Sequence, residues 1–138
     1  MKFVCDAPHD RTWFRLTSEG EANAESEEMH HAVEKHYRRE WERATESFQP
    51  STSVFIEQDI NKAAHIQRAM PLFLTLRDQG GNGLATAMLP PGASTNGACI
   101  IVGPGNTDPY IDHADAIESL ADHFGLTLDR AACFPYRR

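Results

Sequence analysis

Between Ser18 and Phe48, the apolar residues recur at spacings of three, four and seven, with polar residues between them. This is the periodicity of an amphipathic helix. The stripe consists of Ala22, Met29, Ala32, Val33, His36, Tyr37, Trp41, Ala44 and Phe48. Ser18 followed by Glu21 has the form of a capping box, and no proline interrupts the segment. The sequence therefore predicts one long helix over about residues 18–48. Such a helix would be roughly 45 Å long, so it would overhang a small domain, bend, or pack on another copy.

Short runs of strand-forming residues lie on both sides of this helix. Residues 2–5 and 12–16 are separated by a stretch with one proline and two aspartates, and they predict an opening hairpin. Residues 72–77 alternate leucine with other side chains, a glycine-rich turn follows, and residues 84–89 run back. This pattern predicts a second hairpin.

Three other segments have shorter or weaker patterns. Residues 54–57 are a strand candidate. Residues 59–70 fit a short helix that ends before Pro71, although an extended segment remains an alternative. Residues 126–129 predict a last short strand.

The apolar run at residues 98–102 predicts a strand that is buried on both faces, and we expect it in the middle of the sheet. Asp108 and Pro109 have the residue types of a helix start, and Gly125 has that of a helix end. Between them the apolar spacing predicts a second amphipathic helix over about residues 109–124.

This order of elements predicts a single α+β domain over residues 1–138. We expect a largely antiparallel β-sheet of about five or six strands. The long helix (about 18–48) and the second helix (about 109–124) would pack on one face of that sheet.

Composition narrows the functional classes. The chain has 138 residues, 41% of them hydrophobic, and a formal net charge of −7. An acidic chain argues against a nucleic-acid partner, because proteins that bind phosphates usually have a basic face. No apolar run reaches the roughly 18 residues of a membrane span. We therefore expect a soluble, cytoplasmic protein, whose three widely spaced cysteines are reduced thiols.

The loop at residues 103–108 is a candidate anion or ligand site. A strand, a glycine-rich turn and a helix start follow one another there, and such turns present backbone N–H groups to phosphates or carboxylates. The candidate ligands are Gly103, Gly105, Asn106 and Thr107. The alternative is an ordinary turn, because Pro104 lacks an N–H group and the carboxylate of Asp108 would fill the site itself.

Other constellations have weaker support in the sequence. Glu27, His30 and His31 have the spacing of metal ligands on one helix, but no second helix supplies a matching motif, so we expect surface residues and no metal or cofactor. His36 lies on the apolar stripe and is expected in the interior. A cysteine nucleophile would need a nearby histidine and aspartate. The candidate nucleophiles are Cys5, Cys99 and Cys133, and the candidate histidines are His113 and His65. Glu57 and Asp59 are further acid–base candidates, which strand-end polarity explains equally well.

The aromatic part of the long helix predicts a partner surface. Val33, Tyr37, Trp41 and Phe48 are its members, and tryptophan and tyrosine are typical interface anchors. Burial within one chain is the alternative. We therefore expect a non-catalytic interaction or regulatory protein that forms a homodimer or binds another protein through this helix. The alternative function is a small-molecule or nucleotide-like binding domain, or a minor enzyme, that uses the loop at residues 103–108.

Overall fold

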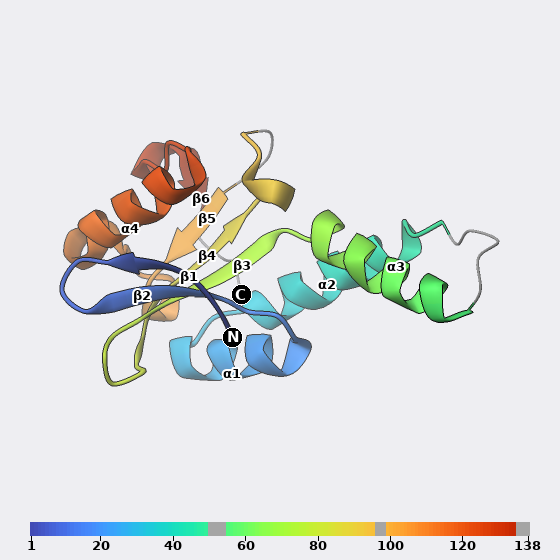
Figure 1. The fold of residues 1–138 in the computed structure, drawn as a ribbon. Helices are drawn as coiled ribbons and strands as arrows, with labels where there is room; N and C mark the ends of the chain where they lie inside the picture. Colours follow the sequence, from blue (N-terminus) through green and yellow to red (C-terminus); the bar gives the residue numbers. More distant parts are fainter. Residues whose placement is uncertain (50–54, 96–98, 135–138) are drawn as a thin grey trace.

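The computed structural model describes residues 1–49, 55–95 and 99–134, in which six strands form one sheet flanked by four α-helices (Figure 1). The strands are β1 (Lys2–Ala7), β2 (Arg11–Arg15), β3 (Leu72–Arg77), β4 (Gly83–Leu89), β5 (Cys99–Val102) and β6 (Cys133–Phe134). The helices are α1 (Glu19–Met29), α2 (Val33–Glu46), α3 (Phe55–Ala69) and α4 (Tyr110–Phe124). The strands lie side by side in chain order; β1 to β5 are antiparallel, and β6 runs parallel to β5. The predicted α+β class and both hairpins are confirmed.

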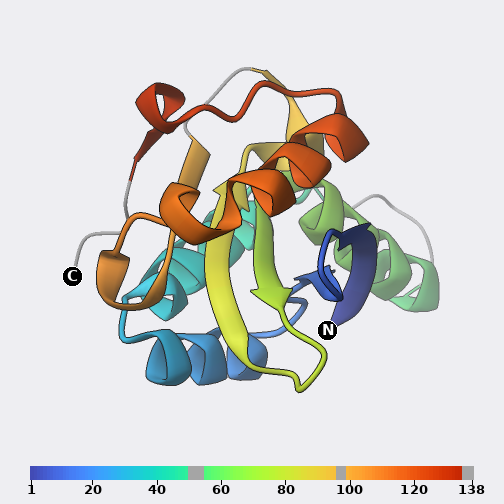
Figure 2. The ribbon, with the colours of Figure 1, turned by 90° about the vertical axis from the view of Figure 1, so that its left-hand side faces the viewer.

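Helices cover both faces of the sheet, which corrects the prediction of one covered face. α4 lies across one face, and α1 and α2 lie on the other (Figure 2). Successive residues of a strand point to opposite faces. Leu74 and Leu76 of β3 thus join the cluster under α4, whereas Phe73 packs on Tyr37 of α2 with ring centroids 5.1 Å apart. Among the described residues, no helix has the length and apolar character needed to cross a bilayer.

The predicted long helix is two helices, because the chain leaves the helical path at residues 30–32. His30 adopts a left-handed conformation with φ of 55°, and its N–H donates to the carbonyl of Ser26. Helices usually place glycine at such a position, so a histidine gives no sequence signal for the break. The apolar stripe continues past it because both helices pack on the same face. At the helix start, the Ser18 hydroxyl accepts from the Glu21 N–H at 3.2 Å, as the capping box predicts.

Two strand predictions are wrong and one helix prediction is confirmed. Residues 55–57 begin α3 instead of forming a strand, while Val54 is outside the described ranges. A short apolar run is ambiguous between strand and helix, and the helical pattern of residues 59–70 extends to it. Residues 126–129 form no strand, and the last strand is β6.

The apolar strand β5 is buried on both faces as predicted, but it is not in the middle of the sheet. It lies between β4 and the two-residue strand β6. Ile101 packs in the cluster under α4, and Ile100 and Val102 pack in the cluster under α1 and α2. Helices on both faces therefore explain its composition, and a central position is not needed.

Arg11 of β2 connects the first hairpin to α4 through hydrogen bonds and an ion pair of its side chain. Its side chain is 7% exposed, and its Nη2 donates to Oδ1 of Asp115 at 2.6 Å. Its Nη1 lies 2.9 Å from Nδ1 of His113, and its Nε donates to the carbonyl of Pro8 at 2.7 Å. Because a guanidinium can only donate, Nδ1 of His113 accepts this hydrogen bond and must be unprotonated.

The contact with Arg11 predicts a pH dependence of stability. Partial burial, followed by the positive charge of Arg11, lowers the pKa of His113, although Asp112 and Asp115 oppose the shift. The unfolded chain therefore takes up this proton first as the pH falls. Stability is fully present above the ordinary histidine pKa of about 6.5 and is lost as the pH falls below it. We expect a loss of less than about 1 kcal/mol, because the site is partly solvated.

Denaturant unfolding of the wild type and of His113→Asn between pH 7.5 and 5 measures this effect. The variant should lose stability less steeply than the wild type. Some slope should remain, because burial and Arg39 also lower the pKa of His36. Equal slopes for the two proteins would contradict the assignment.

Candidate functional site

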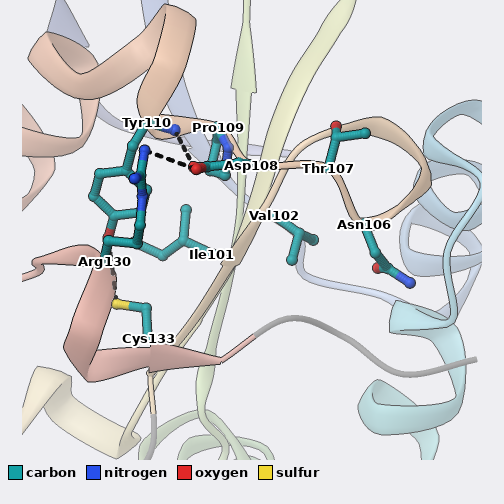
Figure 3. Close-up of a pocket in the computed structure, with 9 residues that line it drawn as sticks. All are labelled: Ile101, Val102, Asn106, Thr107, Asp108, Pro109, Tyr110, Arg130 and Cys133. Atoms are coloured by element: carbon teal, nitrogen blue, oxygen red, sulfur yellow. Dashed lines mark hydrogen bonds and ion pairs between the residues drawn. The ribbon is translucent and has the colours of Figure 1, made fainter.

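The loop between β5 and α4 borders a cavity of about 180 Å³ (Figure 3). Its lining consists of Ile101, Val102, Asn106, Thr107, Asp108, Pro109, Tyr110, Arg130 and Cys133. Two of the four predicted ligands, Asn106 and Thr107, are therefore at the cavity, whereas Gly103 and Gly105 are not part of its lining. Arg130 and Cys133 come from the end of the chain, and the sequence pattern gave no reason to join them to this loop.

Both glycines of the loop have structural roles. Gly105 has φ of 64°, a left-handed conformation that glycine adopts without strain. A Cβ atom on Gly103 would come within 2.7 Å of the Thr107 hydroxyl oxygen. The N–H of Gly103 donates to the carbonyl of Thr107 at 2.8 Å, and the N–H of Thr107 donates to that of Pro104 at 3.2 Å. These two amides are therefore not directed at a ligand.

A carboxylate of the chain itself occupies the start of α4. Oδ1 of Asp108 accepts from the N–H of Tyr110 at 2.9 Å, and Oδ2 lies 2.7 Å from Nη2 of Arg130. An incoming anion would have to compete with this carboxylate for both donors. The cavity is also smaller than the roughly 300–1,000 Å³ of most ligand sites. The anion site thus stays a prediction, with Oδ1 of Asn106 as a buried acceptor that has no partner among the described residues.

Tyr110 and Cys133 face each other at the other end of the cavity (Figure 3). The Tyr110 hydroxyl donates to the carbonyl of Leu128 at 2.8 Å and lies 3.5 Å from Sγ of Cys133. Burial raises the pKa of Tyr110 and that of Cys133. Burial also raises the pKa of Cys5 and of Cys99, so none of the three thiols has the lowered pKa that is typical of a catalytic cysteine.

The predicted partner surface is divided between the core and the outside. Val33 and Tyr37 are buried, Phe48 packs on the ring of His65, and Trp41 is 44% exposed. Trp41 borders a second cavity of about 340 Å³ between α2 and the start of α1. The lining consists of Thr17, Ser18, Glu19, Tyr37, Arg38 and Trp41. At its rim, Nε of Arg38 donates to Oε1 of Glu19 at 2.8 Å.

A buried polar network under α1 is the part of the structure that the sequence interpretation missed. Glu25 has no exposed surface, and one of its oxygens pairs with Arg77 of β3. Its other oxygen accepts from the Thr86 hydroxyl at 2.5 Å, and the Thr75 hydroxyl also hydrogen-bonds to the Glu25 carboxylate. Nε2 of His31 lies 2.8 Å from Oγ1 of Thr86.

The register of the sheet and the break between the helices assemble this network. Thr75 and Thr86 are direct cross-strand partners of β3 and β4, so both hydroxyls reach the same carboxylate. Since the Thr86 hydroxyl donates to Glu25, it accepts from His31, whose Nδ1 receives the N–H of Val33 at 3.4 Å. These bonds assign the neutral Nε2–H tautomer to His31. Burial raises the pKa of Glu25, and its hydrogen-bond donors offset only part of this shift.

One sequence signal could have identified Glu25. It lies three residues after Ala22 and four before Met29, which is the spacing of the apolar stripe, so a charged side chain was directed at the core.

The predicted metal ligands do not lie on one surface: His31 is buried, whereas Glu27 and His30 are exposed. Across residues 1–49, 55–95 and 99–134, no three histidine, cysteine or acidic side chains are arranged to hold a metal ion. The side chains of Glu57 and Asp59 are outside the description.

The comparisons with known proteins give no relative on which a role could be based. The chain matches no family model, no curated protein and no solved structure.

Proposed function

We propose that this protein is a non-catalytic interaction protein that self-associates through the outer face of α2. The observation that carries the proposal is Trp41, a large aromatic side chain that is 44% exposed beside a cavity whose lining includes Tyr37. Tryptophan is enriched among the residues that dominate binding energy at protein interfaces, so an exposed tryptophan is a candidate anchor. Self-association would cover it.

The charges around Trp41 support a second copy as the partner. Arg38, Trp41 and Glu42 lie at positions i, i+3 and i+4, so they share one exposed side of α2. Two antiparallel α2 helices related by a two-fold axis would place Arg38 of each copy near Glu42 of the other, with the tryptophans between them. Such a surface is complementary to itself, as a symmetric dimer contact requires. α3 and the C-terminal part of α2 lie to one side of the sheet (Figure 1), whereas the first part of α2 packs on it through Val33 and Tyr37.

Trp41→Ala tests the proposal by light scattering coupled to size exclusion over a wide range of protein concentrations. We expect a wild-type dimer, and a variant that is monomeric with an unchanged circular dichroism spectrum. Ile111→Ala is the matched control, because Ile111 is 76% exposed but belongs to α4. The control should dimerise like the wild type.

Charge reversal distinguishes a symmetric contact from general stickiness. Arg38→Glu and Glu42→Arg should each weaken the dimer by about tenfold or more, which corresponds to about 1.4 kcal/mol, and an equimolar mixture of the two should form a heterodimer. Arg43→Glu serves as the control, since Arg43 follows Trp41 by two positions and therefore lies on a different side of α2. A wild type that remains monomeric at every concentration, or dimerisation that survives Trp41→Ala, would refute the proposal.

A further inference from the structure

Two cysteines that are far apart in the sequence are neighbours in the sheet. Cys99 of β5 and Cys133 of β6 are direct partners in the parallel register of these strands. Neighbouring strands lie about 4.8 Å apart, and paired residues point to the same face. Both side chains accordingly pack against the cluster under α4. A disulfide requires Cα atoms about 4.4–6.8 Å apart, which is the separation that strand pairing provides.

We propose that Cys99 and Cys133 are a redox-active dithiol that closes to an intramolecular disulfide when the protein meets glutathione disulfide. Each of the two cysteines is partly exposed, so the pair is not sealed within the core. β6 has only two residues and lies at the edge of the sheet, so it can shift by the small distance needed for the ideal S–S geometry. Cys5 lies on β1 at the opposite edge of the sheet and takes no part.

The reaction is an ordinary thiol–disulfide exchange in two steps. One cysteine loses its proton, and its thiolate attacks a sulfur of glutathione disulfide, which releases one glutathione thiolate that takes up a proton. The second cysteine, deprotonated in turn, attacks the protein sulfur of the mixed disulfide and releases the other glutathione. The two protein thiols thus lose two electrons and two protons, and one glutathione disulfide becomes two glutathione thiols. Because burial raises the pKa of both cysteines, we expect the rate to increase with pH.

Closing the disulfide would change the cavity next to the loop. Cys133 is one of the residues that line the cavity, and its Sγ lies 3.5 Å from the Tyr110 hydroxyl. Bond formation with Cys99 draws this sulfur toward β5, while Tyr110 keeps its hydrogen bond to the carbonyl of Leu128. The covalent link also closes a loop that contains α4, so it restrains the unfolded chain. The redox state of the pair therefore controls both the shape of this cavity and the attachment of β6.

The test uses the Cys5→Ser variant, which leaves the two proposed partners as the only cysteines. The variant is equilibrated in glutathione buffers of decreasing reducing power, and free thiols are alkylated and counted by mass spectrometry. We expect both thiols to disappear together in a monomeric product, and peptide mapping to find Cys99 linked to Cys133. The melting temperature of the oxidised form should rise by about 10 °C.

Two single-thiol controls make the result specific. Cys99→Ser and Cys133→Ser, each combined with Cys5→Ser, should yield only a glutathione adduct and no rise in melting temperature. The proposal is overturned if the Cys5→Ser protein retains both thiols in fully oxidised glutathione. It is equally overturned if that protein yields only glutathione adducts or links between two chains.

Discussion

Replacing Glu25 with alanine is expected to lower the free energy of unfolding by about 3–5 kcal/mol. The substitution leaves Arg77, whose side chain is only 11% exposed, without its buried partner, and it removes the acceptor of the Thr75 and Thr86 hydroxyls. Arg77 would keep only its contact with the half-exposed Glu28, and removing a buried partner is far more destabilising than losing a surface ion pair. Urea unfolding followed by circular dichroism measures the change.

Glu28→Ala is the matched control for this prediction. Glu28 pairs with the same Arg77 at 3.0 Å, but its side chain is 44% exposed, so we expect a loss of about 1 kcal/mol or less. Replacing the pair together, as Glu25→Leu with Arg77→Leu, should recover much of the stability that Glu25→Ala loses, since the charge left without its partner is the half-exposed carboxylate of Glu28 and not a buried one. Equal losses for Glu25→Ala and Glu28→Ala would contradict the view that burial of the carboxylate decides the effect.

Trp13→Ala is expected to destabilise the protein by about 3–5 kcal/mol. Trp13 of β2 has no exposed surface, and its indole N–H donates to the carbonyl of Ala116 in α4 at 2.8 Å. Truncation would leave a large cavity where the first hairpin meets α4. Thermal and denaturant unfolding of the variant measure the loss.

Trp13→Phe separates packing from hydrogen bonding in this contact. The variant keeps an aromatic ring but lacks the indole N–H, so we expect it to lose about 1–2 kcal/mol. Trp13 and Trp41 are the two tryptophans of the chain, so Trp13→Phe also leaves Trp41 as the single reporter of indole fluorescence. A loss as large for phenylalanine as for alanine would assign most of the effect to the hydrogen bond instead of to the packed volume.

Elements with local signals could be predicted from the sequence. The turn at residues 78–83 gave the second hairpin, and Gly125, with φ of 69°, ends α4 where its residue type indicated. The Ser18 cap likewise fixed the start of α1. In each of these cases the deciding interaction lies within a few residues, so a pattern along the chain contains all the information.

The features that could not be predicted depend on contacts between distant segments. The break at His30 has no glycine or proline to mark it. It allows His31 to hydrogen-bond to Thr86 on β4, which lies far away in the sequence. The same holds for the second covered face of the sheet, which follows from how the helices pack and not from the helical periodicity. At the loop cavity, Asn106 and Thr107 were predicted because they lie in the glycine-rich turn between a strand and a helix start. Arg130 and Cys133 join them only because β6 pairs with β5.

The match between strand order and chain order has a consequence for how the molecule folds. Four of the six strands belong to hairpins that can close within microseconds of being synthesised. The pairing of β2 with β3, however, joins two strands that are separated in the sequence by residues 16–71, which include three helices. Loop closure over that distance carries the largest entropic cost in the sheet. We therefore expect the docking of the two hairpins, and not the formation of either one, to limit the folding rate.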